Sequence, residues 1–245
     1  MHVPSGDTQT LELVTFADAL EAANTPSQDY DIRQWLYAPN YYCDYRYILG
    51  TRGVNPLICI GINPSTARPG CLDNTLKSVE RIALGNGFDS FLMFNVYAQR
   101  ATDPNAMERR CNPELHRENM AAFRYVLSIS HCPAVWAAWG SIIEKRDYLP
   151  SCLRDMLGIG EEYGAKWYCA GAVTKKGHPH HPLYLRRDEK LKPFDMENYL
   201  RSLQYAPAPC RGGSQPPARH KTTITNRVGR IRTTSNNRIA YCSSL

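Results

Sequence analysis

The chain has 245 residues, 43% of them hydrophobic, and is therefore long enough to bury one sizeable core. Its formal net charge of +6 is uneven, because residues 206–245 hold seven of the 29 Lys and Arg and none of the 23 Asp and Glu, which leaves 22 basic against 23 acidic residues in 1–205. A nearly neutral body shows no sign of a broad basic surface, and no apolar run approaches the roughly 18 residues of a membrane span.

The N-terminus lacks the basic and apolar regions of a signal peptide, and the nine cysteines are scattered singly without a CxxC pair. Both features are typical of a cytoplasmic protein with reduced thiols. We expect no membrane association and no cofactor, and the sequence does not determine the oligomeric state.

The first third of the chain predicts an extension followed by two strands. Residues 1–29 form the N-terminal extension, with an amphipathic helix over 10–23. An aromatic-rich strand follows at 41–49 and is placed to pair antiparallel with the next one. Residues 57–60 predict a fully buried strand, which ends at Gly61 and a polar turn, Asn63-Pro64-Ser65.

Helices and strands alternate through the rest of the body. A helix over 73–86, capped by Asp73 or Asn74, precedes a second buried strand at 91–94, and a helical region over 113–128 precedes a third strand at 134–139. Another helix, a fourth strand at 166–173 and a last helix over 194–203 follow. The glycines at 158, 160 and 164 are off the spacing of a dinucleotide-binding loop and predict an ordinary loop.

This order predicts a single α/β domain over residues 30–205, three-layered, with a mainly parallel four-stranded sheet. Residues 206–245 are rich in Pro, Gly, Ser, Thr, Asn and Arg and poor in large apolar residues, so they predict a basic disordered tail.

The four predicted strands end at Asn63, Asn95, Gly140 and the loop of His181. In a parallel sheet these ends share one edge, which is where open α/β sheets bind their ligands. The amides of Asn63 and Asn95 suit reading a nucleobase edge or orienting a water; the alternative is an asparagine that bonds its own turn.

The loop after the fourth strand contains His178, His180 and His181. No Cys, Asp or Glu stands near them at a ligand spacing, so the pattern does not favour a metal. A histidine here is suited to stabilise negative charge or shuttle a proton, and a hydrogen bond to backbone is the alternative.

Two further polar positions have alternative interpretations. Ser65 and Thr66 precede a helix and either bind an anion or cap the turn, with capping favoured. Arg100 either pairs with Asp103 in an internal salt bridge, the favoured interpretation, or contacts a phosphate.

Several motifs occur in an order that resembles the domain of unknown function 1643 family, uncharacterised proteins of bacteria and bacteriophages. The resemblance covers about residues 42–200 and implies no activity. The motifs are Arg46-Tyr47-Ile48-Leu49, Asn63-Pro64-Ser65-Thr66-Ala67, Asn95-Val96-Tyr97-Ala98, Arg100-Ala101-Thr102-Asp103-Pro104, Ala138-Trp139-Gly140 and His181-Pro182-Leu183-Tyr184-Leu185.

Four segments also resemble motifs of the uracil-DNA glycosylase superfamily, namely residues 61–65, 91–95, 139–141 and 181–182. This resemblance implies the uracil-DNA glycosylase fold, with Asn63 positioning the attacking water, Asn95 bonding the pyrimidine edge and His181 stabilising the departing base. The other candidate substrate-binding residues are Gly61, Ser65, Tyr97, Arg100 and Gly140, with Tyr97 or Tyr42 as the stacking aromatic.

Three functions remain open on these grounds. The first is hydrolysis of an N-glycosidic bond, on a base in DNA or on a nucleoside or nucleotide. The second is another hydrolase or transferase reaction on a small nucleotide-like ligand. The third is non-catalytic binding of nucleotides or nucleic acid. All three predict a partner that contains a nucleobase, with DNA among the candidates.

Overall fold

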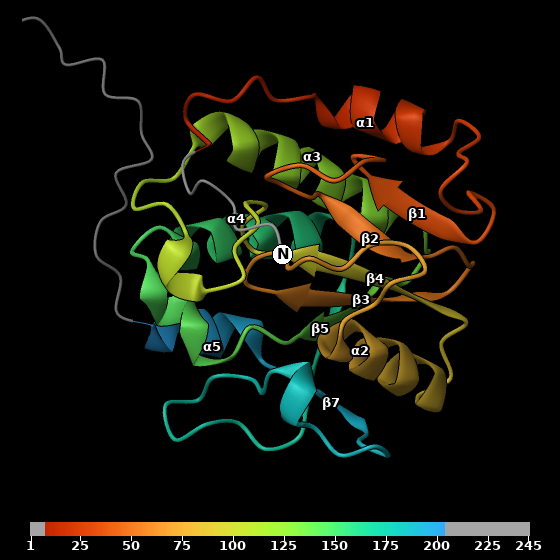
Figure 1. Ribbon diagram of the computed structural model, residues 1–245. Helices are drawn as coiled ribbons and strands as arrows, with labels where there is room; N and C mark the ends of the chain where they lie inside the picture. The colour runs from red at the N-terminus through yellow and green to blue at the C-terminus, as the bar shows by residue number, and fades with distance from the viewer. Residues whose placement is uncertain (1–7, 204–245) are drawn as a thin grey trace, which may run out of the picture. The chain divides into compact units, whose positions relative to one another are not determined.

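The structure is a computed structural model that describes residues 8–203, so the predicted tail at 206–245 lies outside the described residues. A seven-stranded sheet has the order β1-β2-β4-β3-β5-β6-β7 (Figure 1). The strands are β1 (Trp35–Ala38), β2 (Ile48–Thr51), β3 (Pro56–Gly61), β4 (Ser90–Asn95), β5 (Ala134–Ala137), β6 (Lys166–Ala170) and β7 (Leu191–Pro193).

The sheet is parallel at its centre and antiparallel at both edges. Strands β4, β3, β5 and β6 pair in parallel, whereas β1 with β2, β2 with β4 and β6 with β7 pair antiparallel. The α/β class is confirmed, and the four predicted buried strands are the four central ones. The sheet nevertheless has seven strands rather than four, and β2 pairs with β4 instead of β3.

Helices cover both faces of the sheet. They are α1 (Phe16–Ala23), α2 (Asn74–Gly85), α3 (Pro113–Ser128), α4 (Leu149–Glu162) and α5 (Met196–Ser202), with short 3-10 helices η1 (Pro104–Ala106), η2 (Gly140–Lys145) and η3 (Pro182–Tyr184). None of the helices within 8–203 is long and apolar enough to cross a membrane.

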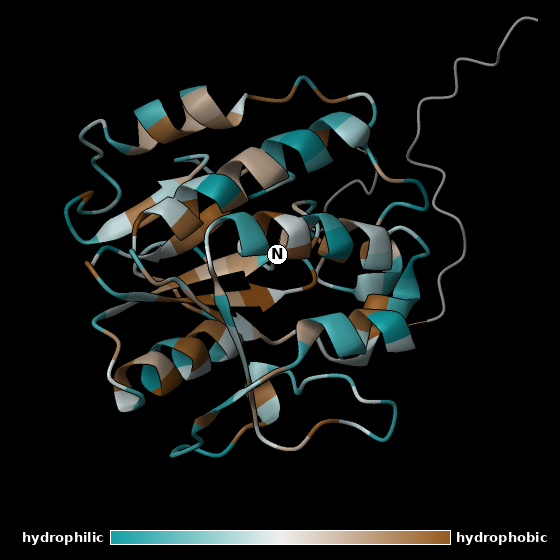
Figure 2. Ribbon diagram, turned by 180° about the vertical axis from the view of Figure 1, so that it is seen from behind, coloured by the Kyte–Doolittle hydropathy of each residue, from teal (hydrophilic) through white to brown (hydrophobic). Residues whose placement is uncertain are grey.

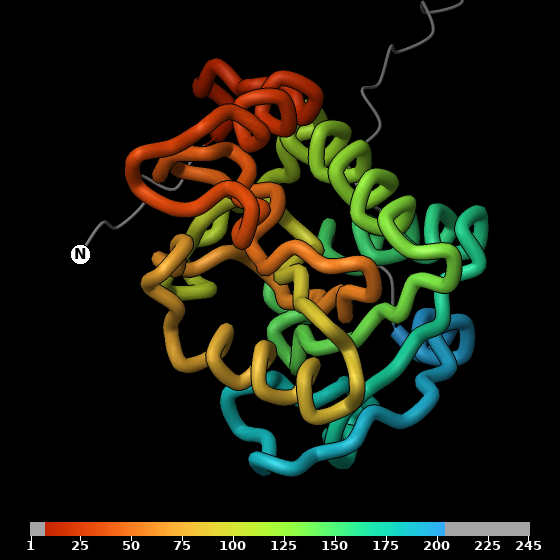
Figure 3. Tube along the Cα trace, turned by 90° about the vertical axis from the view of Figure 1, so that its right-hand side faces the viewer, coloured from red at the N-terminus to blue at the C-terminus, as the bar shows by residue number. Residues whose placement is uncertain are grey.

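The core is divided by the sheet into two layers. Ile58 and Ile60 of β3 pack in the cluster that contains α1, α3, α4 and α5, whereas Leu57 and Cys59 pack in the cluster that contains α2. Figure 3 shows α2 and α3 on opposite sides of the strands. The molecule therefore has three layers, helix, sheet and helix.

Strand β3 is apolar on both faces because both are covered. All six of its residues are buried, as expected of a central parallel strand, and Figure 2 draws the central strands largely in brown. The following helix begins where the sequence predicts, because the Asp73 carboxylate accepts a hydrogen bond from the Leu76 N–H at 2.8 Å.

Three predicted segments differ most from the structure. The strand predicted at 41–49 is β2, which begins only at Ile48 and ends at Thr51. Helix α1 begins at Phe16 rather than near residue 10, with the Thr15 side chain as its N-cap. The predicted loop around Gly158 and Gly160 is wrong, because both glycines lie inside α4. Burial of the apolar stripe that includes Met156 outweighs the roughly 1 kcal/mol that a glycine costs within a helix.

The connections make the C-terminal end of β3 a topological switch point. The chain passes from β3 through α2 to β4 on one side, and then through α3 to β5 on the other side of β3. Because α2 and α3 lie on opposite faces, the loops diverge at this end and leave a crevice, the usual ligand position in open α/β sheets.

Candidate functional site

A pocket of about 220 Å³ lies at this switch point. Its wall is formed by the turn after β3, the start of α2, and the loops that follow β4, β5 and β6. Four of the predicted site residues line it: Gly61, Asn63, Ser65 and His181. The wall also contains charged and apolar residues that were not predicted as site residues: Arg46, Asp73, Thr75, Met93 and Trp139.

The side chain of Asn63 both holds its turn and presents an acceptor. Its amide nitrogen donates to the carbonyl oxygens of Pro64 at 3.2 Å and Ala101 at 2.6 Å. These bonds fix the amide plane, and none of the described residues donates to the Asn63 Oδ1. The turn-forming alternative is therefore correct for the nitrogen, while the oxygen stays available in the pocket wall.

The His181 ring is neutral at neutral pH and has a defined tautomer. Its Nδ1 accepts a hydrogen bond from the Leu183 N–H at 3.4 Å, so the proton of the neutral ring resides on Nε2. Burial lowers the pKa of His181, and the charge of Asp73 partly opposes this. The ring therefore offers an uncharged N–H donor in the pocket wall.

Gly140 packs behind His181. Its φ of +62° lies in the left-handed region that favours glycine, and a Cβ there would stand 3.7 Å from the His181 Cβ. Gly140 thus serves as a close-packed support for the histidine loop and does not itself line the pocket.

Asn95 has an unsatisfied buried side chain. It is 0% exposed, and neither its amide oxygen nor its amide nitrogen has a hydrogen-bond partner among residues 8–203. The Asn95 Oδ1 lies 3.2 Å from where a Cβ on Gly61 would stand, so the amide lies directly behind the glycine in the pocket wall. A buried polar group without partners costs about 1–3 kcal/mol and is rare in native proteins.

Asp73 joins the turn after β3 to the start of α2. The Ser65 hydroxyl donates to one carboxylate oxygen of Asp73, while the other accepts from the Leu76 N–H at 2.8 Å. Capping is therefore the role of both side chains within the fold, and it also fixes a carboxylate in the pocket wall.

Arg100 lies buried beneath the Ser65 turn, where it donates to the Ser65 carbonyl and to the Tyr37 hydroxyl. The predicted salt bridge with Asp103 is wrong. The Asp103 carboxylate instead caps η1 by accepting from the Asn105 N–H at 2.8 Å. The short spacing of Arg100 and Asp103 along the chain predicted their pairing. Residues 98–100 instead pair with another segment of the chain, and this pairing turns the Arg100 side chain inward.

Residues 46–183 match the sequence pattern of a family described as "Protein of unknown function (DUF1643)". The match covers more than half of the 245 residues and includes every residue that lines the pocket. The chain belongs to the DUF1643 family. No curated protein and no solved structure matches the chain significantly.

Tyr97 lies in the DUF1643 region but away from the pocket. Its hydroxyl donates to the Glu108 carboxylate and accepts from the Asn112 N–H at 2.8 Å, and its ring packs 4.9 Å from that of Tyr148. Burial, and then the charge of Glu108, raise the pKa of Tyr97. Tyr97 therefore belongs to a buried polar cluster and is not the stacking aromatic.

Trp139 is the aromatic side chain in the pocket wall of this DUF1643 protein. Its indole N–H donates to the Tyr199 hydroxyl at 2.9 Å, which fixes the ring. Tyr42, the other aromatic considered from the sequence, instead lies over the Arg100 guanidinium at 4.3 Å. The signal for Trp139 in the sequence was its position at the end of the predicted strand 134–139, just before Gly140.

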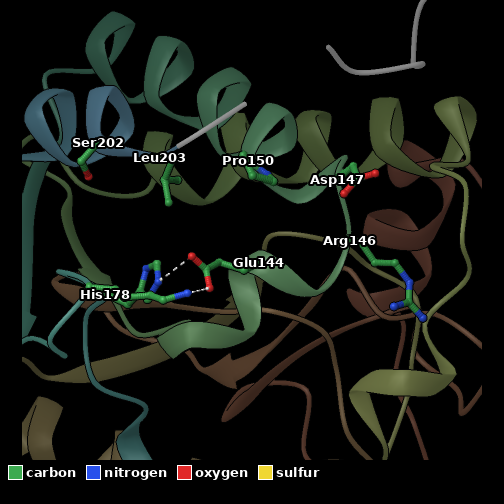
Figure 4. Close-up of a pocket in the computed structure, with 8 residues that line it drawn as sticks. Glu144, Arg146, Asp147, Pro150, His178, Ser202 and Leu203 are labelled. Carbon is green, nitrogen blue, oxygen red and sulfur yellow. Dashed lines mark hydrogen bonds and ion pairs between the residues drawn. The ribbon is translucent and has the colours of Figure 1, made fainter. Parts of the chain in front are cut away.

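A second, larger pocket of about 540 Å³ is a weaker candidate for the DUF1643 site. In Figure 4 the side chains of Glu144 and His178 face each other at one end of it. The Glu144 carboxylate is also paired with the Lys176 ammonium at 2.7 Å, and Arg146 donates to backbone carbonyls. Three of its charged side chains, Glu144, Lys176 and Arg146, thus already have partners. The part of the chain that the structure describes contains no cluster of His, Cys, Asp or Glu suited to a metal ion.

Proposed function

We propose that the pocket of about 220 Å³ binds a nucleobase and that the protein hydrolyses the N-glycosidic bond of a nucleotide or nucleoside. The observation that carries the proposal is the buried Asn95 amide, for which the described part of the chain supplies neither a donor nor an acceptor partner. A nucleobase edge presents a donor and an acceptor side by side, which complements a side-chain amide.

The dimensions of the pocket support a small planar ligand. Its volume of about 220 Å³ is below the roughly 300–1,000 Å³ of sites for drug-sized molecules. The missing side chain at Gly61 gives such a ligand access to Asn95. The methyl of Met93 takes part of that space, 2.6 Å from the position of a Gly61 Cβ, and its flexible side chain can move aside.

The wall supplies the groups that hydrolysis needs. The bond between C1′ and the base nitrogen breaks, and its electron pair leaves with the base. The neutral His181 stabilises that charge by donating from Nε2–H. The Asn63 oxygen orients the attacking water, which bonds to C1′, and the Asp73 carboxylate accepts the water proton.

Two sequence features support this choice of reaction and substrate. The resemblance of residues 61–65, 91–95, 139–141 and 181–182 to motifs of the uracil-DNA glycosylase superfamily supports cleavage at an N-glycosidic bond. The net charge of −1 over residues 1–205, from 22 basic and 23 acidic residues, favours a free nucleotide or nucleoside over duplex DNA. Duplex affinity depends on many cationic contacts to phosphates.

Base release from nucleosides, nucleotides and base-modified DNA tests the proposal. Removing a group that stabilises developing charge typically costs about 10²–10³ in rate, so His181→Ala is expected to lose activity on that scale. His180→Ala is the matched control, because this neighbouring histidine does not line the pocket. Binding of a base without release from any substrate would contradict hydrolysis and leave a non-catalytic binding protein.

A further inference from the structure

Two buried arginines, Arg46 and Arg100, reach the same turn from neighbouring segments. The Arg46 N–H donates to the Ala98 carbonyl at 2.9 Å and the Arg100 N–H to the Asp44 carbonyl at 2.8 Å, on either side of an antiparallel bridge between Tyr45 and Gln99. Side chains 46 and 100 therefore project from the same face as a diagonal pair. Such pairs are about 7–8 Å apart, within reach of long side chains.

Each guanidinium is only partly satisfied. Arg46 is 1% exposed and donates from Nη1 to the Ala67 carbonyl at 3.1 Å, and its Nε is buried without a partner in the residues that the structure describes. Arg100 is also 1% exposed, and its Nε is likewise buried and unpartnered. Holding the turn at residues 65–67 explains one Nη bond of each arginine, and Arg100 also donates to the Tyr37 hydroxyl, but both Nε–H groups remain unexplained.

The positive charges of the two arginines are not paired within the described residues. Neither arginine forms an ion pair with any residue that the structure describes, although both are buried. Asp73 is the carboxylate in the same wall, and its oxygens already accept from the Ser65 hydroxyl and the Leu76 N–H. Asp44 stands opposite Arg100 in the same pairing, but neither it nor Asp73 forms an ion pair with either arginine in the described residues, and a buried charge without such a partner is strongly unfavourable.

The electrostatic environment of Arg46 also favours a bound anion. Burial, and then the charge of Arg100, lower the pKa of Arg46 to about 9, so the guanidinium keeps its proton at neutral pH. The first turn of α2, which supplies Thr75 and Leu76 to the wall, adds the partial positive charge of a helix N-terminus. An anion bound beside Arg46 would compensate all of these groups.

We propose that Arg46, with Arg100 behind it, forms a phosphate subsite in the pocket, so that the ligand is a nucleotide rather than a nucleoside. The geometry of a guanidinium suits phosphate and carboxylate equally well. The choice of phosphate rests on the proposed function, because phosphate is the anion that a nucleotide carries beside its base.

Thermal unfolding of the full chain tests the subsite without any turnover. At matched ionic strength, phosphate is expected to raise Tm relative to chloride and to acetate in the wild type but not in Arg46→Gln. In chloride, Arg46→Gln is expected to unfold at the wild-type Tm or above it, since an unpaired buried charge has been removed. A merely structural arginine would instead lower Tm when replaced.

Arg52→Gln is the matched control. Arg52 also donates to backbone carbonyls, those of Ile32 at 2.8 Å and Trp35 at 3.2 Å. It follows β2, however, and so lies at the other end of this strand from Arg46. It should keep the full phosphate response. Arg46→Lys retains a positive charge but lacks the planar guanidinium, so phosphate should raise its Tm by less than in the wild type. This variant replaces Arg46→Gln in the test if Arg46→Gln does not fold.

Three results would overturn the subsite: no rise of Tm with phosphate in the wild type, an equal rise of Tm with acetate, or an equal rise of Tm with phosphate in Arg46→Gln.

Measurements of affinity test the subsite separately from the proposed function. Nucleoside 5′-monophosphates should bind about 10- to 100-fold more tightly than the nucleosides, and Arg46→Gln should abolish this difference. If phosphate binds but no base is released, only the proposed hydrolysis is contradicted. If base is released at a rate that depends neither on the phosphate of the substrate nor on Arg46→Gln, only the subsite is contradicted.

Discussion

Two buried asparagines differ in how their amides are satisfied. The Asn119 nitrogen donates to the carbonyls of Asn95 and Val96 at 3.0 and 3.4 Å and so holds the end of β4, although its Oδ1 is buried without a partner among the described residues. The Asn95 amide has no such bond. At the scale of the residue, one asparagine supports the fold, and the other retains its hydrogen-bonding capacity for a ligand.

This difference predicts opposite effects on stability. Asn95→Leu, a replacement of similar shape, should raise the free energy of unfolding by up to about 1–3 kcal/mol, because it removes an unsatisfied amide, and should abolish binding of nucleobases. Asn119→Leu should lower it by a similar amount, because two carbonyls lose their donor. Denaturant unfolding of both variants is the measurement, and equal destabilisation by the two would contradict the assignment.

The lowered pKa of His181 predicts a pH dependence with a defined sign. The unfolded histidine titrates near 6.5 and the folded one below that value, so the unfolded state binds more protons in this window. The contribution of His181 to stability is complete above about pH 6.5 and declines as the pH falls toward the folded pKa. The rate of base release should stay at its neutral-pH value until the pH falls below 6.5. An NMR titration of His181 with a midpoint above 6.5 would contradict this.

At the scale of the element, α4 shows how packing overrides local propensity. Gly158 and Gly160 both lie in this helix, but in different surroundings. A Cβ at Gly158 would meet nothing within 4 Å, whereas one at Gly160 would come within 3.3 Å of the Trp167 ring. The second glycine lets the helix approach β6, and the first has no such role.

Alanine substitutions distinguish these roles. Gly158→Ala should raise the free energy of unfolding by about 0.5–1 kcal/mol, the usual gain in an exposed helix interior. Gly160→Ala should gain less or lose stability, because Trp167 must shift. Chemical denaturation of the two variants tests this, and an equal gain in both would show that Trp167 does not restrict the helix.

At the scale of the whole molecule, charge is distributed unequally along the chain. Residues 206–245 carry seven Lys and Arg without an acidic residue, and they account for the excess of positive charge. In the pocket wall, by contrast, the buried Arg46 acts over short distances, with the buried Arg100 behind it. These two sets of cations predict two kinds of anion binding with different salt dependence.

Any salt-dependent binding of DNA by the full chain should therefore come from residues 206–245. Replacing their seven Lys and Arg with Gln is expected to remove that binding and flatten the dependence of affinity on salt. Nucleotide binding in the pocket should be unchanged, since Arg46 remains. Titrations of DNA and of a nucleoside monophosphate at several salt concentrations measure both, and DNA binding that survives the replacement would point to the body.

Much of the fold and part of the pocket follow from local patterns. The four central strands each contain an apolar run, and such runs identify buried strands without knowledge of their partners. The cap of α2 and the polar residues at strand ends, Asn63 and His181 among them, are equally local. Strands β1 and β7 are short, and only pairing with neighbours makes them strands.

The contents of the site depended on contacts between distant segments. Pairing of residues 44–46 with 98–100 places Arg46 in the wall and turns Arg100 away from Asp103, while Tyr97 is drawn into a cluster with Glu108. The sequence by itself determined that polar groups gather at the C-terminal edge of a buried sheet, because strand ends are encoded locally. Only the tertiary structure decided which of them lack a partner, because hydrogen bonding and charge balance must be counted over the whole pocket.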